Sequence, residues 1–491
     1  MKRPGLSFCL FFVCITVSSA SSQTQPVNCT ELMAWLTSGI PTDRLVRIVQ
    51  ERGIAAVPGK AQIRQFESAG ANANLARALS GLKPSIVPSG VTPNASCEIP
   101  PILVQAAEDA GAGRFHQAEL TLRQVSESDP QNAALHFALG TMLRQQELWD
   151  DAFDEITLSA KLMPDFPENH STLAYIFYRL DDGPNSIAEA RTALSMDPQN
   201  AEAYQILGLG LYSNEQYAAS AHAYAESLAR DPNNADTYYD LGIALHAAGN
   251  PAGAVAAYRN AIHLNSAFWQ AHSNLALILH EQHSLDEAIS EYREAKRLAP
   301  DDPSVRNNLG NTYCDKGDFE AAIVELRQLY QLHPEWVQGH PCLARAYMSK
   351  KDYGSAINEF RLAVQQDPNG SAEHRGLGEA LLLDDRVEES VRELQLAVAL
   401  NPDSEAAHHS LGTALFREQQ NEAAEKEFRE ALRLNPSPDN HYSLAACLMS
   451  MDRYNEALAE LDIAARLDPE RQLYRARRDE LLKLMRQPDS R

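Results

Sequence analysis

The sequence has 491 residues, of which 44% are hydrophobic and 22% are charged. These fractions are typical of folded proteins and exclude a disordered chain, a collagen-like fibre and a disulfide-dense mini-protein. The formal net charge of −23 argues against a general attraction for nucleic acid or anionic lipid, because an acidic surface repels both. At roughly 150 residues per domain, the length alone predicts about three domains.

Residues 1–20 have the pattern of a secretory signal peptide. Lys2 and Arg3 precede an apolar run over residues 6–17, and small residues lead up to Ala20. We expect cleavage after Ala20 and an exported product, periplasmic or extracellular. A membrane anchor is the alternative, but a bilayer span needs about 20 apolar residues. We see no second apolar run and expect no membrane insertion after cleavage.

Residues 27–83 predict a small helical module, and residues 84–98 a proline-rich linker. Apolar residues in the module recur at helical spacing, among them Trp35 and Phe66. Cys29 and Cys97 bracket the segment, and in an oxidising compartment they are candidates for one disulfide. The alternative, two unpaired cysteines that act as small apolar residues, stays open.

Prolines recur at a fixed interval through the remainder of the chain. Each follows the previous one by the same step, as Pro164 follows Pro130, and only the last step is shorter by one. A period of about 34 residues indicates stacked helical repeats rather than separate globules. We therefore predict eleven repeats over residues 99–471 and number each so that this proline is position 32. The series is Pro130, Pro164, Pro198, Pro232, Ser266 in place of proline, Pro300, Pro334, Pro368, Pro402, Pro436 and Pro469.

Other positions of the repeat also share their character. Position 8 is always Gly or Ala, position 20 is Ala or Ser, and position 24 is a large apolar residue in every repeat but one, which has Ala190. The apolar positions follow helical spacing, so each repeat predicts two antiparallel helices that the small residues allow to approach closely. The closing proline ends the second helix, because the residue before a proline disfavours helical geometry.

This pattern resembles the tetratricopeptide repeat (TPR) family. The resemblance implies an all-α fold, a TPR solenoid built as a right-handed superhelix of helix–turn–helix repeats. It also implies that residues 472–491 form a capping helix and tail, with Leu473, Leu481, Leu484 and Met485 over the last exposed face. The module over residues 27–83 is similar to those that precede TPR arrays in some exported bacterial proteins.

Position 4 departs from the family pattern, which has tryptophan there. His136, His170, His272, His340, His374 and His408 occupy it, with Tyr204 and Tyr238 in two repeats. Successive histidines are a whole repeat apart, too far to share a zinc ion at about 2 Å. We therefore predict that they pack within each helix pair, and we assign no metal site and no cofactor.

Family geometry implies which residues face the concave groove of such a superhelix. The asparagines among them resemble part of the asparagine ladder of O-linked N-acetylglucosamine transferases, where amides hold an extended peptide's backbone. One amide offers both a donor and an acceptor to a main chain. A merely solvated polar face is the alternative. The predicted partner-binding groove comprises Tyr175, Tyr178, Tyr212, Tyr239, Asn274, His280, Asn307, Asn308, Asn311 and Arg345.

No catalytic motif is present: the sequence lacks GxSxG, P-loop, HExxH and dinucleotide-binding fingerprints. We expect a non-catalytic, exported scaffold that binds extended segments of partner proteins in its groove. The alternative is a structural subunit of a cell-envelope assembly or secretion complex, which would dock through its outer faces or through residues 27–98. A third, weaker hypothesis places an enzymatic activity in residues 27–98.

Overall fold

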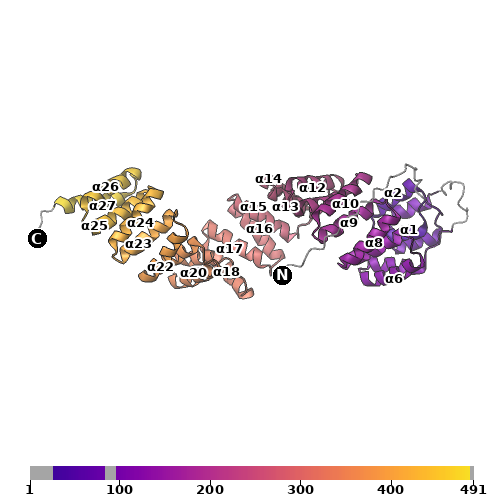
Figure 1. The fold of residues 1–491 in the computed structure, drawn as a ribbon, viewed down its shortest axis with the longest axis horizontal. Helices are drawn as coiled ribbons and strands as arrows, with labels where there is room; N and C mark the ends of the chain where they lie inside the picture. Colours follow the sequence, from indigo (N-terminus) through magenta and orange to yellow (C-terminus); the bar gives the residue numbers. More distant parts are fainter. Residues whose placement is uncertain (1–25, 83–95, 487–491) are drawn as a thin grey trace, which may run out of the picture. The chain divides into compact units, whose positions relative to one another are not determined.

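The computed structural model describes residues 26–82 and 96–486 (Figure 1). The predicted signal peptide and most of the predicted linker lie outside the described residues. The described part contains 27 α-helices, and its β pairing is one isolated bridge between Val27 and Ile54. The predicted all-α fold is confirmed. None of the described helices is long and apolar enough to cross a bilayer.

The chain divides into two compact units, Met1–Gly249 and Asn250–Arg491. In the first unit, four helices of the N-terminal module precede nine helices of the repeats. Their bounds are α1 Cys29–Thr37, α2 Thr42–Arg52, α3 Lys60–Ser68, α4 Ala73–Ser80, α5 Pro101–Gly111, α6 Phe115–Ser128, α7 Ala133–Gln145, α8 Trp149–Leu162, α9 Pro167–Arg179, α10 Gly183–Met196, α11 Ala201–Ser213, α12 Tyr217–Arg230 and α13 Ala235–Ala247.

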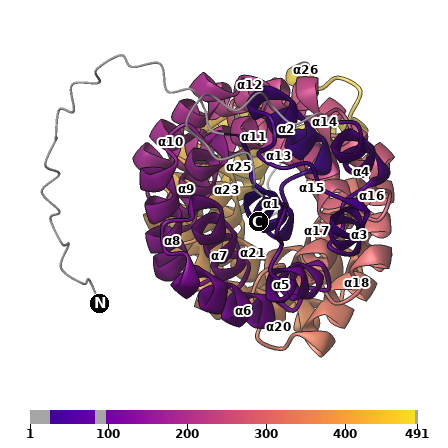
Figure 2. The ribbon, with the colours of Figure 1, turned by 90° about the vertical axis from the view of Figure 1, so that its right-hand side faces the viewer.

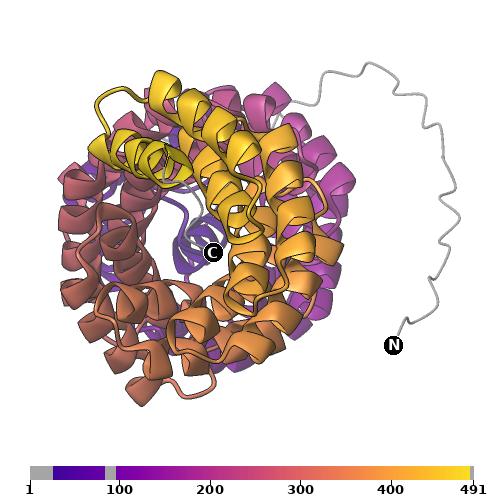
Figure 3. The same ribbon diagram turned by 90° about the vertical axis from the view of Figure 1, so that its left-hand side faces the viewer.

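The second unit continues the alternation of first (A) and second (B) repeat helices, and Figure 3 shows it in colours from salmon through orange to yellow. Its helices are α14 Pro251–Leu264, α15 Trp269–Glu281, α16 Leu285–Leu298, α17 Pro303–Lys316, α18 Phe319–Leu332, α19 His340–Ser349, α20 Tyr353–Gln366, α21 Ser371–Leu383, α22 Val387–Leu400, α23 Glu405–Arg417, α24 Asn421–Leu434, α25 Pro438–Ser450, α26 Tyr454–Leu467 and α27 Gln472–Arg486.

The helix ends follow from residues at fixed repeat positions. Two residues after the closing proline, the side chain of Asn132, Asn200 or Asn234 accepts a hydrogen bond from the first turn of the next A helix. Position 15, between the A and B helices, has a left-handed φ in each repeat. Glycine suits this conformation best, yet most repeats tolerate another residue. The position is occupied by Gly113, Glu147, Asp181, Glu215, Gly249, His283, Gly317, Lys351, Asp385, Gln419 and Asp452.

Each helix pair except that of the third repeat, which has Ala190, packs a small residue at position 8 against a large one at position 24. A Cβ atom added to Gly208 would lie 2.7 Å from the ring of Tyr224, which is buried. The position 20 residue adds a hydrogen bond, since Ser220 Oγ donates to the Gly208 carbonyl at 2.7 Å. Close approach and a satisfied hydroxyl therefore explain why these positions accept only small residues.

The N-terminal module packs directly against the first repeats. Helix α1 contacts α5 and α7, and Figure 2 shows it on the inner side of the curve that the A helices form. Trp35, fully buried, stacks on Phe166 with ring centroids 5.1 Å apart. Arg44 forms an ion pair with Glu168, at 2.6 Å between Nε and Oε1. One continuous apolar core includes residues of the module and of the first three repeats.

Two disulfides link separate segments of the chain. Cys29 and Cys97 are bonded, with their Cα atoms 5.4 Å apart, and this bond holds the start of α1 beside the residues that lead into α5. The second joins Cys314 of α17 to Cys342 of α19, with Cα atoms 6.1 Å apart. The spacing of Cys314 and Cys342 in the sequence does not indicate this pairing, because the two residues lie in different repeats.

Helix α19 is shorter than the other A helices. It begins only at His340, because Gly339 adopts a left-handed φ of 96° and ends the preceding loop. Pro341 then lies in the first turn, where a missing N–H costs nothing. The Cys314–Cys342 disulfide therefore fixes the A helix that has lost its first turn.

The last repeat is covered by α27, which packs on α26. Leu481 is fully buried there, but Leu473, Leu484 and Met485 are 46%, 47% and 37% exposed. The expectation that all four leucine and methionine side chains cover the last repeat is therefore wrong for three of them. The larger buried side chain is that of Tyr474, whose hydroxyl donates to Asp439 at 2.7 Å.

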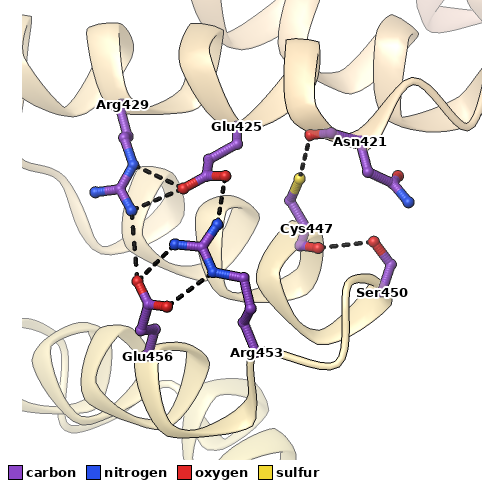
Figure 4. Close-up of polar contacts among 7 residues, drawn as sticks. All are labelled: Asn421, Glu425, Arg429, Cys447, Ser450, Arg453 and Glu456. Carbon is purple, nitrogen blue, oxygen red and sulfur yellow. Dashed lines mark hydrogen bonds and ion pairs between the residues drawn. The ribbon is translucent and has the colours of Figure 1, made fainter.

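An ion-pair network links α24 to the start of α26 (Figure 4). Glu425 accepts hydrogen bonds from Arg429 at 2.8 Å and from Arg453 at 2.6 Å, and Arg453 also reaches Glu456 at 2.6 Å. Beside it, Cys447 is buried and its thiol donates to the Asn421 carbonyl at 3.2 Å. Burial raises the pKa of Cys447 to about 11, so this thiol is a packing residue rather than a nucleophile.

Candidate functional site

The A helices form the inner layer of each unit. In the first unit α7 contacts α9 and α9 contacts α11, and in the second α15, α17, α19, α21, α23 and α25 make the same successive contacts. Side chains on the exposed side of these helices are the ones that neighbouring repeats bring together. The predicted groove residues all lie on A helices, and the two units present different chemistry there.

Aromatic and arginine side chains gather on the first unit. The rings of Trp149 and Tyr175 lie 6.2 Å apart, and Tyr178 lies 6.2 Å beyond Tyr175. The Arg179 guanidinium lies 4.4 Å from the Trp149 ring centroid, and that of Arg144 lies 5.3 Å from the Tyr175 centroid. These cation–π contacts hold both arginines over the rings. Trp149, Arg144 and Arg179 were not among the predicted residues.

A cavity of about 410 Å³ is lined by Arg144, Trp149, Tyr175 and Arg179 together with Ile206 and Leu209 of α11. A larger cavity of about 600 Å³ lies between the α1–α2 loop and α7, α9 and α11. Its wall includes Arg44, which bridges Glu168 and Asp197. Burial raises the pKa of Glu168 even though Arg44 opposes that shift. The N-terminal module thus supplies one side of the inner surface, which the repeat pattern alone could not indicate.

The remaining predicted tyrosines lie farther along the same unit. Tyr212 is 36% exposed, and its ring lies 5.2 Å from that of Tyr217. Tyr239 is half-buried on α13. Next to it in sequence, burial raises the pKa of the Asp240 carboxyl to about 6. Asp240 occupies the repeat position that Asn274 and Asn308 hold in the next two repeats.

In the second unit the inner layer carries amides. Asn274 on α15 and Asn308 and Asn311 on α17 are half-buried. Asn307, by contrast, is only 5% exposed, and its amide nitrogen donates to Asn308 Oδ1 at 3.3 Å. Asn307 therefore supports Asn308 from within the repeat and has little surface for a partner.

A charged cluster adjoins the amides and spans three repeats. His280 Nε2 lies 2.9 Å from Asp315 Oδ2, and Arg345 Nη2 lies 3.2 Å from Asp315 Oδ1. The structure brings the two predicted residues His280 and Arg345 together through Asp315, which sequence reasoning missed. The three side chains come from α15, α17 and α19, so the cluster exists only where these repeats stack in register.

The chemistry of both surfaces is that of noncovalent recognition. Amide groups and a shared carboxylate can exchange hydrogen bonds with a main chain, while tyrosine and tryptophan rings offer apolar contact with polar edges. No group of three or more histidine, cysteine or acidic side chains suited to a metal ion occurs within residues 26–82 and 96–486.

Comparison with known proteins identifies the family of the repeats. The tetratricopeptide repeat family model matches residues 103–164, 171–235, 207–261, 239–303, 307–371, 342–405 and 409–471, well over half of the chain. A search of curated proteins finds no match.

Several solved structures are similar to this chain at low sequence identity. MamA from Desulfovibrio magneticus RS-1 is 21% identical over 34% of this chain and 95% of its own, with a TM-score of 0.33. A thermophilic TPR protein of Thermus thermophilus is 22% identical over 37% of this chain and 100% of its own, with a TM-score of 0.32. Yeast Tom70 is 14% identical over 78% of this chain and 95% of its own, with a TM-score of 0.33. With its family model matched along the array and eleven repeats in register, the chain belongs to the tetratricopeptide repeat family.

Proposed function

We propose that this protein is an exported, non-catalytic scaffold that binds extended segments of partner proteins along the inner layer of its A helices. TPR arrays are protein-interaction scaffolds and generally non-catalytic. One observation chiefly supports the binding of extended segments: the amides of Asn274, Asn308 and Asn311 lie half-buried on two successive A helices.

An extended peptide carries unpaired N–H and C=O groups, and amide side chains satisfy both. Because these hydrogen bonds involve only the main chain of the partner, they add affinity without selecting for a particular partner sequence. The neighbouring Asp315 carboxylate, held between His280 and Arg345, is a fixed acceptor for a partner N–H. In the first unit, Trp149 and Tyr175 supply aromatic contact area at low entropic cost, which suits apolar anchoring of a partner.

Export is part of the same proposal. The signal-like pattern of residues 1–20 motivates it. The Cys29–Cys97 and Cys314–Cys342 disulfides fit an oxidising compartment, since cytosolic proteins rarely keep such bonds. Fractionation of cells and determination of the mature N-terminus test it. An intact N-terminus in the cytosolic fraction would refute export.

Site-specific photocrosslinking tests the binding surface. A photoreactive amino acid at Asn311 probes the inner layer, and the same residue at Val324, which is 62% exposed on the B helix α18, is the matched control. Inner-layer binding predicts adducts from position 311 and few from position 324. Because both sites lie in the same repeat, differences in folding or expression affect them equally.

The reverse pattern, with adducts only at position 324, would favour the second hypothesis of an assembly subunit that docks through its outer face. A triple variant in which Asn274, Asn308 and Asn311 become alanine provides the complementary loss-of-function test. We expect the variant to keep its helical content and to lose most of its crosslinked partner. Unchanged partner capture would refute the role of the amides.

A further inference from the structure

A histidine–glutamate pair recurs between the two helices of the repeats. We call these pairs, found in seven repeats, the histidine seam. In each, the position 4 histidine on the A helix meets a glutamate on the B helix. The Nδ1 and Oε2 atoms lie 2.6 Å or 2.7 Å apart in His136–Glu155, His170–Glu189, His272–Glu291, His340–Glu359, His374–Glu393, His408–Glu427 and His441–Glu460.

In four of these repeats the second ring nitrogen of the histidine contacts a carbonyl of the preceding repeat. His136 Nε2 lies 3.1 Å from the Pro130 carbonyl oxygen, and His408 Nε2 lies 2.9 Å from that of Pro402. His374 makes the same contact at 3.2 Å and His272 at 3.4 Å. A carboxylate and a carbonyl both accept hydrogen bonds, so both ring nitrogens must donate, and only the imidazolium has two N–H groups. The geometry is therefore that of charged histidine.

Two repeats without histidine support the same conclusion. Arg306 occupies position 4 of the seventh repeat, where it donates to Glu325 at 3.3 Å and to the Pro300 carbonyl at 3.0 Å. This is the histidine pattern made by a permanently charged side chain. In the fourth repeat Tyr204 holds the position, and Arg230 lies over its ring and donates to the Pro198 carbonyl at 2.8 Å. In these two repeats an arginine therefore donates to the carbonyl that histidine contacts in other repeats.

The groups that face the seam are predominantly acidic. Glu155 and Asp129 act on His136, Glu189 on His170, and Glu291 and Glu294 on His272. Arg123 of α6 acts on Glu155, and the ring of Tyr330 stacks on His340 at 4.5 Å. Glu430 lies near His408. The hydrogen bonds that His136, His170 and His272 donate to Glu155, Glu189 and Glu291 raise the pKa of the three histidines.

We propose that the histidine seam is a pH-responsive clasp that tightens the repeat array in mildly acidic solution and loosens it as the histidines lose their charge. Each clasp joins the A and B helices of one repeat, and in several repeats also the closing turn of the repeat before. Loss of one proton leaves a histidine with a single N–H, so it can no longer donate to both acceptors. Because the A helices carry the proposed binding surface, its stiffness changes with the seam.

The direction in which stability changes with pH follows from the coupling of protonation to folding. For a histidine whose pKa is raised on folding, the stabilisation is complete below the unfolded pKa of about 6.5 and is lost as pH rises through the folded value. The array is therefore expected to resist urea better at about pH 6 than at about pH 8.5, on the two sides of that window.

The test replaces histidine by arginine, following the example of Arg306. In the seam variant, His136, His170 and His272 become arginine. In the control variant, His222, His263 and His283, which lie outside the seam, become arginine and give the same change in charge. Urea midpoints from circular dichroism are compared at the two pH values. The wild type and control should lose stability on going to the higher pH, and the seam variant should lose clearly less.

Equal pH dependence in the seam and control variants would overturn the proposal, as would a wild-type midpoint that does not fall. If the arginine variant does not fold, glutamine at the same three positions replaces it, with a lower midpoint near pH 6 and a reduced pH dependence expected. Histidine titration by NMR of the full chain is an independent readout. Resonances of His136, His170 and His272 that titrate at or below about pH 6.5 would equally refute a charged seam.

Discussion

Replacing Trp35 by alanine tests whether the N-terminal module is an integral part of the array. Trp35 is fully buried and stacks on Phe166, which packs edge-on against Phe137 at 5.4 Å between centroids. Truncation of a buried tryptophan to alanine costs about 3–5 kcal/mol, of which the aromatic stacking accounts for about 0.5–1.5 kcal/mol. Native-state hydrogen exchange measures this loss of stability locally. At about 1.4 kcal/mol per factor of ten, the amides of α1 should exchange roughly 10²–10⁴-fold faster.

The effect should also be confined to the start of the chain. Repeats in a solenoid contact only their neighbours, so amides of α23 and α25 should keep their exchange rates. Trp149→Ala is the matched control, because the same truncation on a half-buried ring should leave α1 protected. A less than tenfold change in α1, or an equal change in α23 and α25, would refute the view that Trp35 joins the module to the first repeats.

Three further predictions concern packing, the second disulfide and a buried carboxyl. Gly376→Ala should destabilise the protein by about 1–3 kcal/mol in thermal unfolding, because the new Cβ would lie 2.4 Å from the Phe360 ring, while Gly354→Ala, with nothing within 4 Å, should not. Replacing both Cys314 and Cys342 by serine opens a loop with a sequence separation of 28 and should cost roughly 3–4 kcal/mol on the chain-entropy estimate in urea unfolding; an unchanged midpoint would contradict a closed bond. Asp240→Asn should stabilise the protein by about 1–3 kcal/mol near neutral pH, because burial raises the pKa of this carboxyl to about 6 and penalises its ionised form. Its gain in unfolding free energy should grow as pH rises from about 4 to about 6, and a gain independent of pH would count against it.

The helices of the array could be predicted because the same sequence pattern occurs in every repeat. A single Gly at position 8 or Pro at position 32 has many interpretations, but the same kind of residue at equivalent positions of successive repeats has few. The periodicity therefore determined the helix pairs and their packing. It could not determine where the pattern is interrupted, and the late start of α19 after Gly339 depends on one loop.

The parts that sequence could not place depend on contacts between repeats or with the N-terminal module. Cys314 and Cys342 occupy different positions in adjacent repeats, and only stacked A helices bring them together. Asp315 likewise gains its role from His280 and Arg345 on the helices before and after it. Asn307 shows the converse, since helical geometry put it on the inner side while local packing buried it.

The position 4 histidines show that the same repeat position can hold residues of different chemistry while the helices keep their packing. The family pattern has a tryptophan there, which fills space between the two helices. Histidine fills less space but adds two directional hydrogen bonds, one to the glutamate of its own B helix and one to the preceding repeat. Arg306 makes both with a permanent charge, so position 4 can hold a cation with two donors in place of the aromatic ring that Tyr204 and Tyr238 keep. The stability of such an array depends on the protonation of its position 4 histidines. Replacing these histidines by arginine removes the dependence on pH while a cation with two donors stays in place.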